Sequence, residues 1–368
     1  MKELRDKKYI NALLEEITRK KKLISSPIRL MEVCGTHTMT IHKSGLKSKL
    51  EKAGIDLISG PGCPVCITPN EIHEAAIDLV AQNNHFILTT FGDMTRVPTT
   101  KGALQTIVPA KNSMIKIVYS PEESLEIAKS NQNKEVVFFG VGFETTIPSI
   151  ALTIKTSYQE KIKNFSTLTA FWLIPPPLKA IVEAKDSAIN GFIYPGHVSA
   201  IIGEKPYQFI ADQYGISGAI TGFEPGDILL AIRSILDQIY EKNPIVANEY
   251  SRVVKPSGNK KALAILNEML ETKDAFWRGL GYIPNSGLQL KKKFSSYDAE
   301  KKYHITISPG KNDLPGCKCG EVLRGTLTPP QCPLFASKCR PNSPYGPCMV
   351  SFEGACLAYY KYQYRNKK

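Results

Sequence analysis

The stretch IRLMEVCGTHT, residues 28–38, is mostly apolar as far as Cys34, and after Gly35 it turns polar at residues 36–38. Such a run predicts a buried strand, and the glycine marks its end. The same pattern recurs along the chain and predicts seven further strands. They cover residues 56–60, 85–91, 115–120, 135–142, 168–174, 191–196 and 216–223. Because amphipathic helical stretches alternate with these runs, we expect parallel α/β sheets.

Seven short motifs directly follow these predicted strands. They are CGTHT, GPGCPVC, FGDMT, GFETT, IPPP, PGH and GFEPGD. Ligands of open parallel sheets bind outside the carboxyl ends of the strands, so the seven loops are predicted to line one region. We therefore expect two parallel-sheet α/β domains, residues 28–143 and 144–242, that face each other across a central cleft.

The sequence changes character after residue 242, where Gly, Pro and Lys become frequent and apolar periodicity is weak. Six cysteines lie on its proline-rich loops: Cys317, Cys319, Cys332, Cys339, Cys348 and Cys356. Because so little apolar periodicity is present, we expect a loop-rich third domain, residues 243–368, that a cofactor holds together. A surface helix predicted within residues 1–25 is expected to pack against it.

Composition and charge argue against a nucleic-acid-binding, secreted or membrane protein. The chain of 368 residues is 42% apolar and carries a formal net charge of +13. Its lysines are spread out and no nucleic-acid-binding motif accompanies them, which favours a solvated basic surface or an acidic protein partner over DNA or RNA. The first residues are typical of a surface helix rather than a signal peptide, and no apolar run is long enough to span a membrane. We expect a cytoplasmic protein that binds neither nucleic acid nor membranes.

Nine cysteines in such a chain favour metal or redox chemistry over structural disulfides. The six C-terminal thiols exceed what one four-coordinate site uses. Either four bind a metal centre and two form a redox pair, or two zinc ions share ligands. The closely paired cysteine knuckles of zinc sites are missing from this run, which favours an iron–sulfur cluster.

Cys63 and Cys66 form a C-P-V-C motif, the spacing of dithiol redox pairs and of half a zinc site. No second motif of this kind follows nearby, so the sequence favours a reversible disulfide.

Cys34 lies where a strand enters a turn. A helix that followed would lower the pKa of its thiol and make it a better metal ligand. His37 would then be a second ligand or a proton donor. The alternative is a buried cysteine that acts as a small hydrophobe, with His37 bonded to the backbone. The position among the motif loops favours the metal ligand.

Four single ionisable residues lie beside glycine at strand ends: Asp93, Glu144, His197 and Glu224. Each alone is a common cap or turn residue. Together they predict a polar, hydrogen-bonding site, and we include them among the catalytic candidates. The sequence contains no Walker A or G-x-G-x-x-G motif, so no dedicated nucleotide site is expected.

The motifs CGTHT, GPGCPVC, GFETT, PGHVS and GFEPGD, with the closing cysteine run, resemble the HypD family of hydrogenase maturation factors. The resemblance extends from residue 28 to about residue 362. It implies a scaffold on which the Fe(CN)2CO fragment of [NiFe]-hydrogenase is assembled. The implied partners are the small chaperone HypC and HypE, which supplies cyanide as a protein-bound thiocyanate.

The resemblance also implies one [4Fe-4S] cluster in a domain similar to the catalytic subunit of ferredoxin:thioredoxin reductase. Its implied ligands are Cys317, Cys332, Cys339 and Cys356. Cys319 and Cys348 then remain as an adjacent dithiol or disulfide.

Under this resemblance, Cys34 holds the iron together with a thiolate from HypC, and His37 supports the iron or handles protons. Electrons that release cyanide pass from the cluster through the dithiol and the C-P-V-C pair. Such a protein is mainly a scaffold with redox activity, and the sequence does not decide whether it is an enzyme. The alternative is a stand-alone iron–sulfur thiol-disulfide reductase, in which Cys63 and Cys66 matter most and Cys34 is dispensable.

Overall fold

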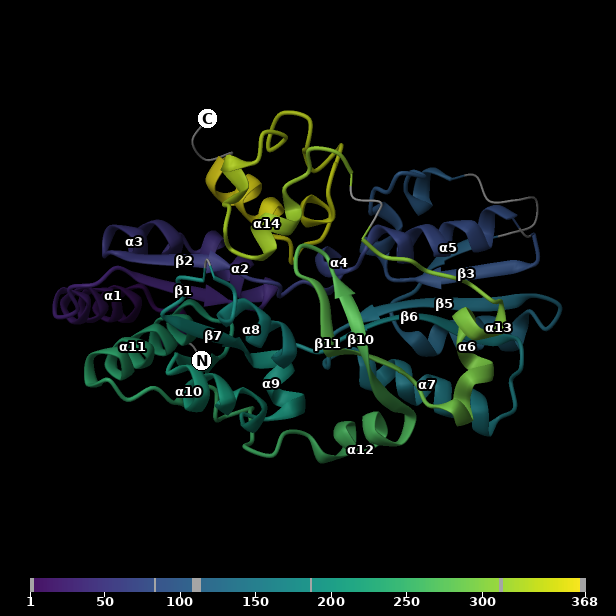
Figure 1. Ribbon diagram of the computed structural model, residues 1–368, viewed down its shortest axis with the longest axis horizontal. Coiled ribbons are helices and arrows are strands. Elements are labelled where there is room, and N and C mark those ends of the chain that lie inside the picture. Colours follow the sequence, from purple (N-terminus) through teal and green to yellow (C-terminus); the bar gives the residue numbers. More distant parts are fainter. Residues whose placement is uncertain (1–2, 83, 108–113, 186, 311–313, 365–368) are drawn as a thin grey trace.

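The computed structural model describes residues 3–82, 84–107, 114–185, 187–310 and 314–364. Two sheets form its α/β body (Figure 1). In the first sheet all neighbouring strands are parallel. Its spatial order is β2 (Ile55–Ser59), β1 (Ile28–Glu32), β7 (Gly191–Pro195), β8 (Ser217–Thr221) and β9 (Val246–Asn248).

The second sheet is mixed, with a parallel part and an antiparallel hairpin at one edge. Its spatial order is β10 (Leu270–Trp277), β11 (Gly281–Leu290), β6 (Phe165–Trp172), β5 (Glu135–Gly142), β3 (Phe86–Thr90) and β4 (Met114–Ile117). Strands β5 and β6 are buried along nearly their whole length, as parallel strands covered on both faces are.

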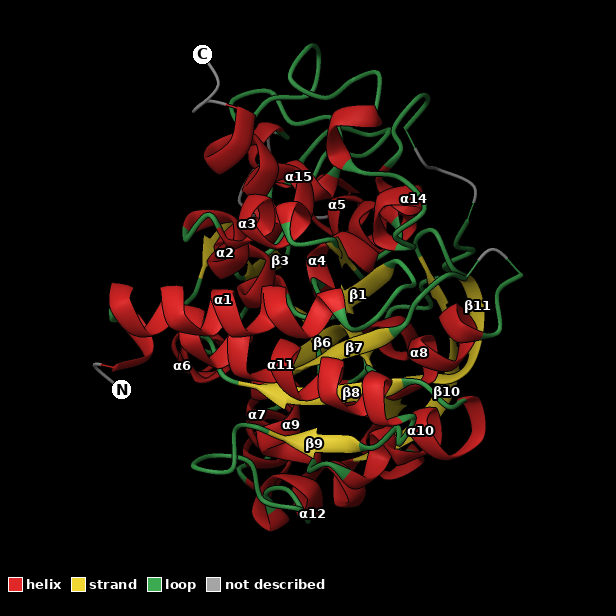
Figure 2. Ribbon diagram, turned by 90° about the vertical axis from the view of Figure 1, so that its left-hand side faces the viewer, coloured by secondary structure: helices red, strands yellow, loops and turns green. Residues whose placement is uncertain are grey.

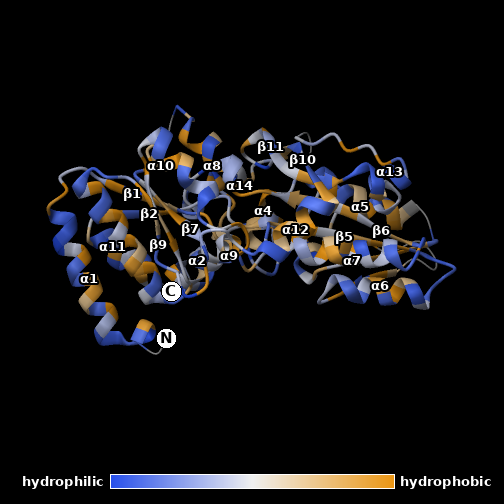
Figure 3. Cartoon of the chain, turned by 90° about the horizontal axis from the view of Figure 1, so that it is seen from below, coloured by the Kyte–Doolittle hydropathy of each residue, from blue (hydrophilic) through white to orange (hydrophobic). Residues whose placement is uncertain are grey.

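Helices cover the sheets on both sides (Figure 2). Those of the body are α1 (Lys7–Lys22), α2 (Gly35–Lys43), α3 (Leu46–Lys52), α4 (Pro64–Ile67), α5 (Asn70–Gln82), α6 (Pro121–Ser130), α7 (Ile147–Gln159), α8 (Pro175–Val182), α9 (Gly196–Ile202), α10 (Gln208–Tyr214), α11 (Pro225–Glu241), α12 (Lys260–Met269) and α13 (Ala299–Lys302). In Figure 3 hydrophobic colours gather on the strands, whereas α1 and α6 carry hydrophilic stretches as well. No helix in the part of the chain that the structure describes is long and apolar enough to cross a membrane.

Over the described residues 314–364, the cysteine-rich C-terminal segment is built from short helices, turns and two isolated bridges, and it lies above the body in Figures 1 and 2. Its elements are α14 (Cys319–Leu323), η6 (Pro329–Gln331), η7 (Pro347–Met349), α15 (Ala355–Tyr359) and η8 (Tyr360–Tyr364). Further short turns in the body are η1 (Glu3–Arg5), η2 (Gly92–Arg96), η3 (Leu104–Thr106), η4 (Lys205–Tyr207) and η5 (Lys292–Tyr297).

All eight strands predicted from the sequence are confirmed, with their ends shifted by a few residues, and the α/β class with parallel sheets is confirmed too. The sequence missed β9, β10 and β11. Strands β10 and β11 contain charged residues, Pro284 and two glycines, which are signals of a loop. They form a strand pair because β11 completes the exposed side of β6.

The strand pairing does not follow the contiguous ranges 28–143 and 144–242. The first range supplies β1 and β2 to one sheet and β3, β4 and β5 to the other, and the second range also contributes to both sheets. Strand β1 pairs with β7, far away in the sequence. Apolar periodicity predicts that a strand is buried but not which strand it pairs with, so the division of the chain into domains stays a prediction.

The N-terminal helix α1 packs against α11 and not against the C-terminal segment, where the sequence led us to expect it. Its buried residues Leu13 and Ile17 share one apolar cluster with Ile228, Ile232 and Ile235 of α11. Helix α11 is apolar on more than one side, so it needs a cover besides the sheet. Helix α1 provides that cover.

Candidate functional site

Cys34 caps the N-terminus of α2, directly beyond the end of β1. It is buried, and the Gly35 amide beside it donates a 3.0 Å hydrogen bond to the Gly62 carbonyl. A methyl group on Gly62 would lie only 2.3 Å from the Cys34 nitrogen, so glycine is required for this approach. The CGTHT and GPGCPVC loops therefore interlock through their backbones, and Cys34 lies close to the loop that carries Cys63.

Burial raises the pKa of the Cys34 thiol to about 12, and the neighbouring Glu353 carboxyl adds to the shift. The expectation that the amides of α2 lower this pKa is therefore wrong in its net effect. The amides of Thr36 and His37 do lower it, but the loss of water around the thiol outweighs them. At neutral pH the thiol keeps its proton unless a metal ion displaces it.

Glu32 is a buried carboxyl in β1 that the sequence did not single out. One of its oxygens accepts a 3.2 Å bond from the Cys34 amide, and the other accepts one from the Thr38 hydroxyl. Burial raises its pKa to about 8. The available signal was a carboxyl inside a predicted strand that is mostly apolar.

His37 and His197 both stack on Phe223, which follows β8. His37 Nε2 lies 2.9 Å from the Gly222 carbonyl, so Nε2 must carry the proton and Nδ1 is left as an acceptor. Burial lowers the pKa of His37 to about 4 and lowers that of His197 as well. The CGTHT, PGH and GFEPGD loops thus meet around one aromatic ring, as their positions at strand ends predicted.

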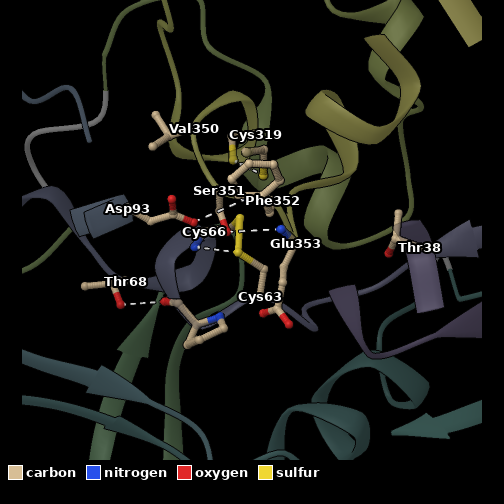
Figure 4. Close-up of a disulfide and its surroundings, with 12 residues drawn as sticks. Thr38, Cys63, Cys66, Thr68, Asp93, Cys319, Val350, Ser351, Phe352 and Glu353 are labelled. Carbon is tan, nitrogen blue, oxygen red and sulfur yellow. Dashed lines mark hydrogen bonds between the residues drawn. A yellow bond between two sulfur atoms is a disulfide. The ribbon is translucent and has the colours of Figure 1, made fainter. Parts of the chain in front are cut away.

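Cys63 and Cys66 are joined by a disulfide at the start of α4. Both cysteines are buried, and residues 350–353 of the C-terminal segment lie over them (Figure 4). The structure therefore places the C-P-V-C pair against the cysteine-rich segment, at the join between this segment and the body.

Asp93 fixes this overlying segment. One of its oxygens accepts a 3.3 Å hydrogen bond from the Phe352 amide (Figure 4). The other pairs with Arg96 at 3.1 Å. Arg96 in turn donates a 3.1 Å bond to the Val350 carbonyl. The FGD motif thus ties residues 350–353 to the body.

Glu353 is a second residue that the sequence analysis missed. Its carboxylate accepts a 3.2 Å bond from the Thr36 hydroxyl, and a methyl group on Gly35 would lie 2.2 Å from its Cβ. Burial raises its pKa. The C-terminal segment therefore packs directly against the CGTHT loop, and this contact requires a residue without a side chain at position 35.

Glu144 of the GFETT motif is almost wholly buried. One oxygen accepts a 3.0 Å bond from the Ile174 amide, and the other has no hydrogen-bond partner among the described residues. Burial raises its pKa to about 7. Burial raises the pKa of Tyr207, and the charges of Glu144 and Cys34 raise it further.

Glu224 has a different environment from the other candidates. It caps α11, and both its oxygens bind the Arg5 guanidinium at 2.6 Å, which lowers its pKa. Its carboxylate is therefore engaged with the N-terminal turn, and its catalytic role stays a prediction.

All six C-terminal cysteines line one cavity, whose wall also includes Leu334, Phe335 and Met349. The sulfur atoms of Cys319 and Cys348 lie 2.8 Å apart without a disulfide between them. Their neighbours in the cavity are Cys317, which contacts Cys319, and Cys356, which contacts Cys348. Hydrogen bonds from the Cys317 and Cys348 thiols lower the pKa of Cys319, and the same contacts raise the pKa of Cys317 and of Cys348.

The donor set of this cavity fits an iron–sulfur cluster. Thiolates are the ligands of such clusters, and an apolar wall excludes water from them. Among the described residues no three or more side chains converge closely enough to hold a single metal ion. The four cysteines of a [4Fe-4S] cluster bind four different irons, so they need not converge on one point.

Comparison with known proteins agrees with these motifs. A family model described as "HypD: Hydrogenase formation hypA family" matches residues 8–363. The chain is 41% identical over 368 residues to the hydrogenase maturation factor HypD of Rhodobacter capsulatus, which covers 98% of this chain and 97% of that protein. It is 40% identical over 339 residues to HypD of Escherichia coli, or 92% of this chain and 90% of that protein. The chain belongs to the HypD family of hydrogenase maturation factors.

Proposed function

We propose that the chain is a scaffold on which the Fe(CN)2CO fragment of [NiFe]-hydrogenase is assembled with proteins of the HypC and HypE type. The observation that carries this proposal is the position of Cys34. It is a buried free thiol at the meeting point of several motif loops, and its loop touches the loop of the Cys63–Cys66 disulfide. One anchor thiol and one redox pair are therefore neighbours.

Cys34 is proposed to hold the iron of the fragment. Low-spin Fe(II) with strong-field ligands suits a soft thiolate, and a second thiolate would come from the HypC-type partner. Because burial raises the pKa of Cys34 to about 12, iron binding must release a proton there. His37 Nδ1 lacks a partner among the described residues and can accept a hydrogen bond from a group at the site, but the lowered pKa of His37 means that its imidazole stays neutral at pH 7.

The redox part of the proposal concerns cyanide. Its release from a thiocyanate needs two electrons: R–S–CN + 2e⁻ gives RS⁻ and CN⁻. A dithiol supplies two electrons and two protons when it closes to a disulfide, and the chain has two cysteine pairs, Cys63/Cys66 and Cys319/Cys348. The remaining C-terminal cysteines would hold a [4Fe-4S] cluster: Cys317, Cys332, Cys339 and Cys356. When bound, that cluster supplies single electrons.

The remaining ionisable candidates are proposed to serve the same site. Asp93 secures the segment over the disulfide, and His197 shares the Phe223 ring with His37. Glu144 is a buried carboxyl that can hold a proton near neutral pH. In this proposal the two α/β units face each other across a cleft, and the C-terminal segment is an iron–sulfur domain.

The test is an infrared spectrum of the anaerobic protein with a HypC-type partner, recorded where metal-bound cyanide and carbon monoxide absorb. We expect bands in the wild type that vanish in Cys34→Ala, while the iron–sulfur absorbance stays. Val33→Ala is the matched control, since it shortens a buried side chain next to Cys34 without removing a thiol. Bands that persist in Cys34→Ala would refute the role of this cysteine.

A second candidate function is a stand-alone thiol-disulfide reductase, favoured by the contact of α4 with both α14 and η7. It predicts reduction of a generic disulfide such as insulin without any partner. Cys34→Ala would leave that rate unchanged, whereas Cys63→Ala would abolish it.

A further inference from the structure

Arg278 lies between β10 and β11, and only 3% of its surface is exposed. Its backbone amide donates a 2.9 Å bond to the Ile67 carbonyl, and its Nε donates a 3.0 Å bond to the Cys66 carbonyl. One terminal nitrogen donates to the Thr68 carbonyl and to Asn70 Oδ1, both at 2.7 Å. One residue thus binds three consecutive carbonyls at the end of α4.

Helix α4 needs such a partner because it has only four residues. The last carbonyls of a helix accept no hydrogen bond from within the helix. When they are buried in the protein interior, leaving them unpaired costs free energy. A buried guanidinium also needs partners, since an unpaired buried charge is costly. Arg278 and the C-terminal end of α4 meet both needs together, and the helix concerned is the one that carries Cys66.

The next residue, Gly279, touches the other cysteine pair. Its φ is +80°, and a methyl group on it would lie 2.5 Å from Gly320 Cα, directly after Cys319. Arg278, Cys319 and Pro347, the neighbour of Cys348, line one small cavity. The turn between β10 and β11 therefore contacts both α4, which carries Cys66, and α14, which carries Cys319.

We propose that Arg278 is the positioning residue that holds the Cys63/Cys66 pair against the Cys319/Cys348 pair, so that dithiol–disulfide exchange between them is fast. The inference rests on the electron route of the proposed function. In the exchange, the Cys63–Cys66 bond breaks and a Cys319–Cys348 bond forms. Two electrons and two protons pass from the second pair to the first, and no other reagent is consumed.

Arg278 is a positioning residue and not a catalytic one, because its hydrogen bonds go to carbonyl and amide oxygens and not to sulfur. Thiol-disulfide exchange depends on the access and alignment of the attacking sulfur. A displacement of about 1 Å can slow a reaction roughly 100-fold. Loosening the end of α4 should therefore slow exchange far more than it changes the amount exchanged at equilibrium.

The experiment uses the anaerobic full-length protein with its cluster. Both pairs are first oxidised, and one equivalent of a phosphine reductant is then added, which takes no part in later thiol exchange. Acid-quenched samples are alkylated, and mass spectrometry of peptides follows how the reduced thiols redistribute between the pairs. Arg278→Lys keeps the positive charge but loses the planar fork of donors, so it separates position from charge.

We expect redistribution to be slowed about tenfold or more in both Arg278→Lys and Arg278→Met. The final distribution should be unchanged in Arg278→Lys. Arg324→Met is the matched control, since its exposed guanidinium follows α14, and it should redistribute like the wild type. If Arg278→Met fails to fold, Gly279→Ala is used instead. It disturbs the contact between the β10–β11 turn and Gly320 of α14 and should also slow redistribution.

Wild-type rates in both Arg278 variants, or slowing in Arg278→Met but not in Arg278→Lys, would overturn the inference while the proposed function stands. If the pairs of the wild type do not exchange at all, the inference and the electron route both fail. The role of Cys34 would even then be decided separately by the infrared spectrum.

Discussion

The two groups of cysteines in this protein are held in place by different means. Cys34, Cys63 and Cys66 lie in the strand-to-helix connections after β1 and β2, which are locked by backbone hydrogen bonds and close glycine contacts. Of the six C-terminal cysteines, three lie on loops and three in helices of only three to five residues. In the body, the packing of sheets and helices fixes the positions of the thiols. In the C-terminal segment, binding of the proposed cluster by the thiols must supply the free energy that orders the chain.

Removal of the proposed cluster should produce the largest difference in stability between the C-terminal segment and the body. Treating the anaerobic protein with a chelator and an oxidant is expected to lower the hydrogen-exchange protection of residues 317–359 about 100-fold, because metal binding there contributes folding free energy. Strands β1 and β5 should keep their protection. Chelator alone is the control, and equal loss of protection in both regions would break the comparison.

The body should respond to pH through Glu144. Its folded pKa of about 7 lies above the unfolded value of about 4.5, so the folded state keeps the proton longer. The stability it contributes is complete below pH 4.5 and is lost as pH rises through 7. Glu32 and His37 titrate over the same range in both proteins, so we expect the free energy of unfolding to fall by about 3 kcal/mol more in the wild type than in Glu144→Gln.

Urea unfolding at several pH values measures this effect, as the difference between the curves of the two proteins. Glu122→Gln, on the exposed side of α6, is the control and should follow the wild type. Parallel curves for wild type and Glu144→Gln would show that the buried carboxyl has no such influence.

Gly35→Ala should damage the contact between the two regions. The new methyl group would lie 2.2 Å from Glu353 Cβ, and overpacking of this kind costs about 2 kcal/mol. We expect lower stability in urea and faster hydrogen exchange at residues 350–356. Gly92→Ala is the control, since its nearest atom would be 3.7 Å away on Ile117. An unchanged exchange rate at residues 350–356 would mean that this contact does not hold the segment.

Asp93→Asn should have the smallest effect. It weakens the bond from the Phe352 amide and the partly exposed pair with Arg96, worth about 1 kcal/mol together. We expect external glutathione to reduce the Cys63–Cys66 disulfide about fivefold faster, because residues 350–353 uncover it more often. Asp78→Asn removes a surface pair with Lys101 and should leave that rate unchanged.

Eight of the strands, the α/β class and the motif loops at the strand ends can be read from the order of the amino acids alone. Apolar β-branched runs and glycine turns are local signals, and they do not depend on what the segment later contacts. The cysteine motifs were equally readable, because their order and spacing belong to the chain. Membership of the HypD family followed from these motifs and was confirmed by the comparisons.

Which surfaces meet becomes visible in the folded protein. Strand β1 pairs with the distant β7, α1 covers α11, and Glu353 lies against Gly35. Burial also reversed the expected direction of the pKa shift at Cys34, and Arg278 became the cap of a helix more than 200 residues before it. Each of these depends on contacts between residues far apart in the chain, and desolvation and hydrogen bonding at such contacts leave no periodic trace in the sequence.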